Sequence, residues 1–193
     1  MEQIYYADIQ SPLGIIWVAG TDKGIYKIEL NKTEESFLKI LESDNKVKSE
    51  YKRKEFHALE EMFERYFKGT PTSFNLPLDL RGTDFQLAIW KAVFRIPYGR
   101  LSTYKALAED IGRPRAVRAA GNAVGDNPLP IIIPCHRVIR SDGTLGGYGL
   151  GLEVKRYLLN LEGIPTINES LRKRISRIEY PMSRDDLLKY FFE

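Results

Sequence analysis

The chain has 193 residues, of which 43% are hydrophobic, and a net charge of +3, which is typical of one large or two small folded domains and argues against a mainly disordered protein. We expect no membrane contact and a cytoplasmic location, or a nuclear one in a eukaryote, because neither a signal peptide nor a run of about 18 apolar residues is found. One cysteine and two histidines exclude an internal disulfide and a zinc cluster, so we expect no metal.

The first 82 residues predict a small α/β domain. Strand patterns over 3–9, 14–19 and 25–30 predict an antiparallel sheet. Helices are expected over 33–41 and 52–68, the second because aromatic residues recur at helical spacing. Residues 74–80 alternate with period two and predict a further strand, which Pro77 favours at the edge of the sheet.

A second, mostly helical domain is expected over 83–164. The run Thr-Asp-Phe-Gln at 83–86 has the pattern of a capping box, which opens a helix expected to continue through Phe94. Beyond it, 165–193 predict a helical extension, because apolar residues recur there at helical spacing. The extension can dock onto the body of the protein or join two copies. We expect a monomer.

Two short helices follow Phe94, the first capped by Ser102 or Thr103 and the second opened by Pro114 and ending at Gly125. Their separation by residues 111–113 gives the outline of a helix-turn-helix. Many helical proteins contain such pairs, so the outline alone is weak evidence.

The second of these helices has two different faces. An apolar stripe is suited to packing, whereas Arg115, Arg118 and Asn122 fall three and four residues apart on another face. Small residues at 116, 119 and 121 keep the helix thin. A thin helix with arginines on one face suits a nucleic-acid groove, and equally suits tight packing against a neighbouring helix.

Positive charge is concentrated between Asp84 and Arg140. This segment holds nine Lys or Arg residues against four Asp or Glu, a net +5, so the rest of the chain is net negative by two. Concentrated positive charge suits contact with phosphates. On charge alone, however, a solvated basic surface is the better explanation.

Cys135 is the chemical centre of the sequence. Prolines at 128, 130 and 134 restrict the backbone, so we expect a rigid extended segment to present the thiol. A lone cysteine is usually a small apolar core residue. Here that interpretation competes with a nucleophilic role, because a histidine such as the adjacent His136 can lower the pKa of a thiol. Consecutive side chains of an extended segment point to opposite sides, so a turn or a water must connect the two.

The residues around Cys135 carry a family pattern. Pro-Cys-His-Arg-Val-Ile at 134–139, preceded by Gly-Asp-Asn-Pro at 125–128 and followed by Gly-Gly-Tyr-Gly at 146–149, resembles the active-site region of the O6-alkylguanine-DNA alkyltransferases. These are also called methylated-DNA–protein-cysteine methyltransferases. The resemblance extends over about 85–163, and more loosely to the N-terminal hairpin and helix.

The resemblance implies a fold and an activity. The fold would be a ribonuclease H-like N-terminal domain followed by a winged helix-turn-helix DNA-binding domain. The activity would be DNA repair by transfer of an alkyl group from O6 of guanine, and also from O4 of thymine, to Cys135. The transfer would be irreversible, with one reaction per protein molecule and no cofactor.

The resemblance also assigns catalytic roles. Cys135 would attack the alkyl carbon, His136 would act through a water as the base, and Glu162 would orient that histidine. Tyr104 would donate a proton to the leaving base and lie against the 3′ phosphate. Asn127 would be a hinge that ties the recognition helix to the cysteine turn.

A substrate pocket follows from the same match. Main-chain groups of Cys135 and Val138 would accept hydrogen bonds from the exocyclic amine of guanine, while Tyr148 and the amide of Gly149 would close the pocket near O6. Many relatives have serine in place of Gly149, which leaves the tolerance of bulky O6 groups open.

Double-stranded DNA containing O6-alkylguanine is the implied partner. A thiol cannot reach O6 of a stacked guanine, so the nucleotide must flip out of the duplex. Arg118 would fill the vacated position from a recognition helix in the minor groove, with little sequence preference. Further DNA contacts would come from Tyr104, Lys105, Arg113, Arg115 and Ser141.

Other function classes share parts of this pattern. A transcription factor would use the same helices, but has no need of Cys135 and His136 beside a pocket tyrosine. A cysteine hydrolase would use both residues, but has no need of a basic recognition helix. Damage-binding relatives lack the cysteine, so Cys135 argues against that class.

Overall fold

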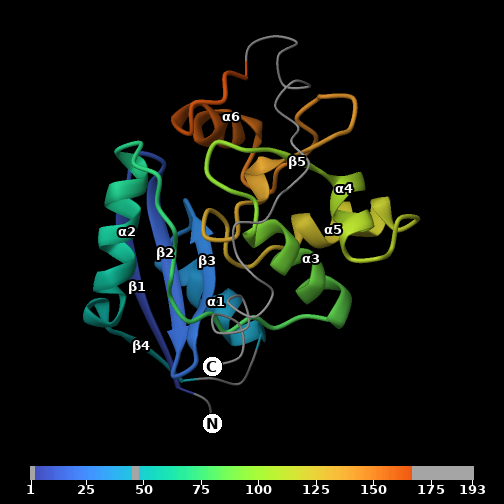
Figure 1. Cartoon of the computed structure of the whole chain (residues 1–193). Coiled ribbons are helices and arrows are strands. Elements are labelled where there is room, and N and C mark those ends of the chain that lie inside the picture. Colours follow the sequence, from blue (N-terminus) through green and yellow to red (C-terminus); the bar gives the residue numbers. More distant parts are fainter. Residues whose placement is uncertain (1–2, 45–47, 167–193) are drawn as a thin grey trace. The chain divides into compact units, whose positions relative to one another are not determined.

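The computed structural model describes residues 3–44 and 48–166, which form two compact units with the boundary between Leu80 and Arg81 (Figure 1). The helical extension expected over 165–193 lies, from residue 167 on, outside the described residues. Within the described ranges, every helix is too short or too polar to cross a membrane.

The N-terminal unit contains a four-stranded sheet with the order β3-β2-β1-β4 (Figure 1). β1 (Gln3–Ser11), β2 (Gly14–Thr21) and β3 (Gly24–Leu30) are antiparallel neighbours, as the alternation predicted. β4 (Lys48–Tyr51) pairs parallel to β1, so the sheet is mixed and not wholly antiparallel. The sequence did not indicate β4, because its largely exposed residues lack the apolar alternation of a strand.

The strand predicted over 74–80 does not form. Leu78 makes a single bridge to Ile25 at the start of β3. The Ile25 N–H donates to the Pro77 carbonyl, and the Asp79 N–H donates to the Ile25 carbonyl, both at 2.9 Å. Pro77 lacks an N–H and so limits the ladder at this edge. The segment therefore lies beside the edge of β3 without becoming a strand.

Helix α1 (Glu34–Asp44) covers one face of the sheet. Phe37 and Leu41 of α1 pack in a cluster with strand residues, which are Ile4, Tyr6, Trp17, Ala19 and Tyr26.

The 3₁₀-helix η1 (Arg53–Phe56) and helix α2 (His57–Phe67) lie on the opposite face, where a Cβ added at Gly20 would approach the Phe56 ring to 3.3 Å. Alternation along the strands separates these two faces. Together η1 and α2 take the place of the single helix predicted over 52–68.

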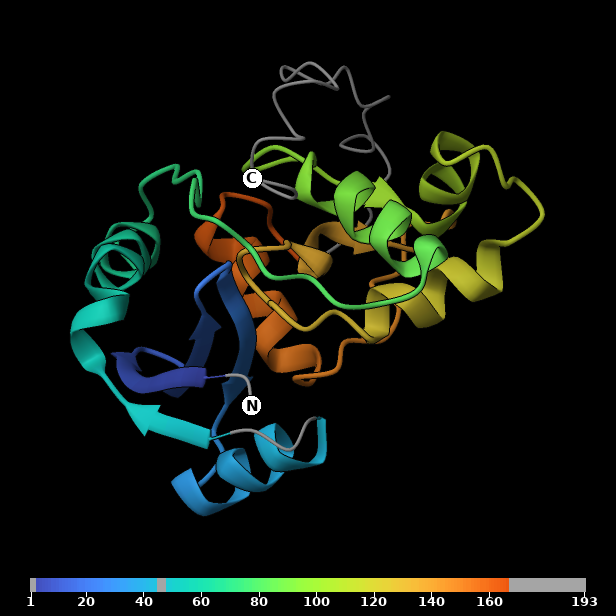
Figure 2. The same ribbon diagram turned by 90° about the horizontal axis from the view of Figure 1, so that it is seen from below.

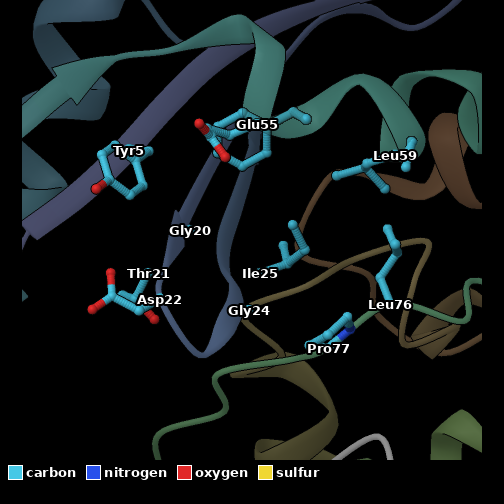
Figure 3. A pocket seen from close by; sticks show the side chains of 12 residues that line it. Tyr5, Gly20, Thr21, Asp22, Gly24, Ile25, Glu55, Leu59, Leu76 and Pro77 are labelled. Carbon is cyan, nitrogen blue, oxygen red and sulfur yellow. The ribbon is translucent and has the colours of Figure 1, made fainter.

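A pocket of about 260 Å³ opens in this unit between the β2–β3 turn, the start of α2 and the segment at 76–77 (Figure 3). Its lining combines apolar side chains such as Leu59 and Leu76 with the carboxylates of Asp22 and Glu55. None of its lining residues is a site residue predicted from the sequence.

The second unit is organised around three helices, α3 (Asp84–Phe94), α4 (Tyr104–Asp110) and α5 (Val117–Gly125), which pack side by side (Figures 1 and 2). The predicted capping box is present, because the Thr83 hydroxyl accepts from the Gln86 N–H and the Gln86 side chain accepts from the Thr83 N–H.

The link between α4 and α5 differs from the prediction. The Thr103 hydroxyl caps α4, as expected, by accepting from the Ala106 N–H. However, α5 begins at Val117 and not at Pro114, because the Ala116 N–H donates to the Arg113 carbonyl in a separate turn. Arg115 therefore lies before the helix, and the predicted arginine face keeps only Arg118 and Asn122 on α5 itself.

A parallel pair of two-residue strands connects the helices to the cysteine region. β5 (Ser102–Thr103) pairs with β6 (Val138–Ile139). Helix α6 (Leu152–Leu161) contributes Leu159 to a small core formed with Leu101, Ile139 and Ile164. This core supports the chain directly after the cysteine.

Candidate active site

Cys135 begins a short 3₁₀-helix, η2 (Cys135–Arg137), and only 6% of the residue is exposed. The Arg137 N–H donates to the Pro134 carbonyl at 2.9 Å, which closes the turn. The prediction of an extended segment was therefore wrong at the cysteine itself. In a 3₁₀-helix, consecutive side chains point about 120° apart and not to opposite sides. An extended strand would direct the two side chains to opposite sides, and the turn removes this obstacle.

Asn127 holds the loop that leads to the cysteine. Its Nδ2 donates to the Ile133 carbonyl at 2.8 Å and to Cys135 Sγ at 3.0 Å, while its Oδ1 accepts from the Leu129 N–H at 3.0 Å. Within this loop Ile131 has φ +76°, a left-handed conformation that β-branched residues rarely adopt. One amide side chain therefore closes a strained loop and positions the sulfur.

His136, Arg137 and Glu162 form a buried charged cluster. Nε2 of His136 lies 2.8 Å from Oε1 of Glu162, which directly follows α6. Nε and Nη2 of Arg137 each donate to the same carboxylate at 2.9 Å, and the Gly99 N–H donates to it at 3.1 Å. The structure thus brings His136 and Glu162 together, and adds Arg137, for which no role in the site was predicted.

Burial alone would raise the pKa of Glu162, but the hydrogen bond from His136 and the charge of Arg137 hold it well below its usual range. Burial lowers the pKa of His136, in spite of the nearby carboxylate. The imidazole is therefore neutral at neutral pH. Because an ionised carboxylate only accepts hydrogen bonds, Nε2 carries the proton and Nδ1 has the lone pair of a base.

Burial also raises the pKa of the Cys135 thiol. Asn127, Lys155 and Tyr148 act in the opposite direction without reversing this effect. The lowered thiol pKa that the adjacent histidine suggested is therefore not found. The resting cysteine is protonated at neutral pH, and forming the thiolate requires a base at the moment of reaction.

Tyr104 is the first residue of α4 and is half-buried. Its phenol lies against Gly146, where an added Cβ would approach the hydroxyl oxygen to 2.9 Å. Burial, followed by the negative charge of an ionised Cys135, raises the pKa of Tyr104. The phenol therefore keeps its proton and is able to donate it.

The other expected pocket residues lie on β6 and on the loop after it. Val138 is buried, and its carbonyl accepts from Nζ of Lys155 at 2.6 Å. Tyr148 is half-buried, whereas Gly149 is exposed and a Cβ added there would meet only the Gly125 carbonyl, at 3.9 Å. Lys155 is a functional candidate that sequence reasoning missed. Its spacing from Leu158 and Leu159 on α6 places it on their inward face, which could have indicated burial.

Of the residues expected to contact DNA, Tyr104 is half-buried and the others are exposed, namely Lys105, Arg113, Arg115, Arg118 and Ser141. Three of the cations counted in the basic segment have acidic partners. Arg95 pairs with Asp110 and Lys105 with Glu109, and both acids are already included in the net charge. Arg137, in contrast, is buried on Glu162, which lies outside the segment. The surface charge of this segment is therefore smaller than the sequence count suggested.

Two family models match the chain. One is the DNA-binding domain of the 6-O-methylguanine DNA methyltransferases, over residues 84–164, and the other is their ribonuclease-like domain, over residues 4–80. The chain belongs to this family. The resemblance seen in the sequence, and with it the fold class, is confirmed.

Individual relatives agree with the family models. The methylated-DNA–protein-cysteine methyltransferase of Methanosarcina barkeri is 44% identical over 161 residues, which cover 82% of this chain and 97% of the relative. That of Haemophilus influenzae is 44% identical over 170 residues, which cover 88% and 92%. The crystal structure of Mycobacterium tuberculosis OGT in complex with DNA matches with 36% identity and a TM-score of 0.69, covering 91% of this chain and 96% of that one. This chain is thus a DNA-repair alkyltransferase of the same family.

Proposed function

We propose that Cys135 accepts the alkyl group from O6 of a guanine in DNA and, by the same displacement, from O4 of an alkylated thymine. One observation carries the assignment. The family transfers the group to a protein cysteine, and this chain has a single cysteine, whose sulfur is held 3.0 Å from Asn127 Nδ2 and is followed by His136 on Glu162.

The chemical step follows from the protonation states of these groups. His136 is neutral, and its Nδ1 takes the thiol proton through a water. The sulfur forms a bond to the alkyl carbon, the bond from that carbon to O6 breaks, and its electron pair stays on guanine. The phenol of Tyr104 then gives a proton to the guanine anion and regains one from the imidazolium through solvent. The net change is that guanine carries the proton the thiol has lost.

Access to O6 requires the nucleotide to leave the base stack. In the proposed complex α5 lies in the minor groove and Arg118, exposed on its first turn, fills the gap. The small side chains of α5 suit that groove, and Lys105, Arg113, Arg115 and Ser141 would contact phosphates, which carry no sequence information. The flipped base would lie near Cys135, the Val138 main chain, Tyr148 and Gly149.

The remaining features of the proposal follow from this step. The alkylated sulfur is a thioether, so each protein molecule reacts once. The transfer needs no cofactor, and we propose that a monomer acts in the compartment that holds the DNA. The chain would contain two domains, over 1–82 and 83–164, and the reaction would take place in the second.

Mass spectrometry after incubation with duplex DNA containing one O6-methylguanine tests the assignment. The intact protein should gain one methyl group, located on the peptide that contains Cys135. Cys135→Ser should gain none while binding the duplex almost as tightly, because Arg118 and the basic surface hold the DNA. A wild-type protein that binds the duplex without gaining a methyl group would be a DNA-binding protein only, and methyl transfer by Cys135→Ser would refute the role of this cysteine.

A further inference from the structure

Lys155 is a buried cation close to the reacting sulfur. Its side chain is 0% exposed, and its Nζ donates to the carbonyls of Val138 at 2.6 Å, Leu145 at 2.5 Å and Gly147 at 3.4 Å. Three carbonyls match the three protons of an ammonium. Its hydrogen-bond partners among the described residues include no carboxylate, so the hydrogen bonds are satisfied while the charge is not balanced.

The other buried charges of the site cancel one another. Arg137 and Glu162 form an ion pair, and His136, which is hydrogen-bonded to the same carboxylate, is neutral. The positive charge of Lys155 is therefore left over. A buried ammonium without an opposite charge is unfavourable. The thiolate of Cys135 would supply the missing negative charge.

Lys155 also connects two segments that border the sulfur. The Val138 carbonyl belongs to β6, directly after η2, whereas Leu145 and Gly147 belong to the loop that leads to Tyr148. The Tyr148 ring centroid lies 6.0 Å from Nζ. One side chain therefore holds both the strand after the cysteine and the loop that carries a pocket tyrosine.

We propose that Lys155 is a positioning residue of the transfer reaction, whose buried ammonium fixes these two segments and balances the negative charge of the Cys135 thiolate as it attacks the alkyl carbon. This inference rests on the proposed function of Cys135. It adds a fixed source of positive charge, separate from the base that removes the proton.

The titration behaviour of the site agrees with this role. Burial lowers the pKa of Lys155 to about 8, and the negative charge of an ionised Cys135 acts in the opposite direction. The charge of Lys155 in turn acts to lower the pKa of the thiol. The titratable groups that face the ammonium are Cys135 and His136 from η2 and Tyr148 from the loop. The ammonium is thus present at neutral pH, when the thiolate is needed.

Lys155→Met tests the proposal, because methionine keeps most of the side-chain length and removes the charge. Arg156→Met is the matched control, since it removes a charge from the adjacent, partly exposed position of α6, whose ion-pair partner among the described residues is Glu153. The rate constant of methyl transfer is measured at saturating duplex DNA as a function of pH. For Lys155→Met we expect a loss of about tenfold or more at pH 7 and a shift of the profile by about one unit to higher pH, as for a thiolate that has lost a nearby cation. Arg156→Met should match the wild type.

The outcomes separate this inference from the function on which it rests. If the wild type transfers the methyl group and Lys155→Met keeps the wild-type pH profile, the inference fails and the proposed function stands. A lower melting temperature with an unshifted profile shows a purely structural lysine and also refutes it. If the wild type transfers nothing, both fail.

A second measurement does not depend on the folding of Lys155→Met. In protein with 13C-labelled lysines, Lys155 should be recognised by its titration near pH 8, against 10.5 for an ordinary lysine. A midpoint near the ordinary value of 10.5 would show that the charge of the ammonium is already balanced in the resting protein, and would overturn the inference.

Discussion

Arg137 and Glu162 form a buried two-point ion pair, in which Nε and Nη2 of the arginine lie 2.9 Å from different oxygens of the carboxylate. His136 shares one of these oxygens. Because Arg137 already balances the carboxylate, the imidazole does not need to be charged in the resting protein. Once it accepts the thiol proton, the same carboxylate stabilises the imidazolium. The ion pair therefore prepares His136 to act as a base.

The first prediction concerns Glu162→Gln and acid stability. Since the folded-state pKa of Glu162 lies below its ordinary value of 4.5, its contribution to stability is complete above about pH 4.5 and is lost as pH falls toward the folded-state value. We expect Glu162→Gln to lower the free energy of unfolding by about 3–5 kcal/mol at neutral pH, because Arg137 is left without its partner. The difference should shrink at pH 3.

Denaturant unfolding at several pH values measures this difference. The comparison is best made in a His136→Asn background, because the imidazole otherwise titrates in the same range. A stability difference that stays constant from pH 7 to pH 3 would contradict the lowered pKa.

The second prediction compares two adjacent glycines. Gly146 has φ +70°, and a Cβ there would lie 2.9 Å from the Tyr104 hydroxyl, whereas a Cβ at Gly147 would meet no atom of the described part of the chain within 4 Å. Gly146→Ala should displace the phenol that protonates the leaving base and strain the loop, lowering stability by about 1–3 kcal/mol and slowing transfer. Gly147→Ala should change stability by less than about 0.5 kcal/mol. Equal transfer rates for the two variants would show that the position of Tyr104 is unimportant.

The sequence predicted the elements and residues whose signals are local. The capping box at Thr83 and the three N-terminal strands depend on neighbouring residues, and the structure has them. β4 escaped prediction because its formation depends on pairing with β1, and the turn at Cys135 because prolines restrict the backbone without specifying where it bends.

The environment of the site residues was less predictable than their identity. A lysine on the inward side of a helix can extend its ammonium to solvent or be buried, and only the carbonyls of distant segments decide which. For Lys155 those carbonyls belong to β6 and to the loop at 145–147. The pKa of Cys135 depends in the same way on burial, so the adjacent histidine alone suggested the wrong direction.

The third prediction separates base flipping from general DNA affinity. Arg118 and Arg115 are both exposed, but only Arg118 lies on α5. We expect Arg118→Ala to slow transfer from saturating duplex DNA, because nothing then fills the vacated stack. Arg115→Ala should weaken binding, most strongly at low salt, and leave the rate at saturation almost unchanged. The control is the reaction with free O6-alkylated guanine base. A large loss of rate in that reaction for Arg118→Ala would show that the arginine supports the pocket instead.

The last prediction concerns the state of the protein after transfer. The thioether at position 135 has no leaving group that water can displace, so titration with excess methylated duplex should end at one methyl group removed per protein. Cys135 is only 6% exposed, and its sulfur accepts a hydrogen bond from Asn127 Nδ2 at 3.0 Å. An added methyl group crowds this contact.

We therefore expect methylation to lower stability by about 1–3 kcal/mol, in the range found for overpacked cores. For a protein of this size that corresponds to a fall in melting temperature of about 2–4 °C per kcal/mol. Cys135→Ser taken through the same incubation and freed of DNA should melt unchanged, which excludes an effect of residual DNA. An endpoint well above one methyl group per protein would overturn the single-turnover mechanism. An unchanged melting temperature of the methylated protein would show that the loop between Asn127 and Cys135 has room for the added group.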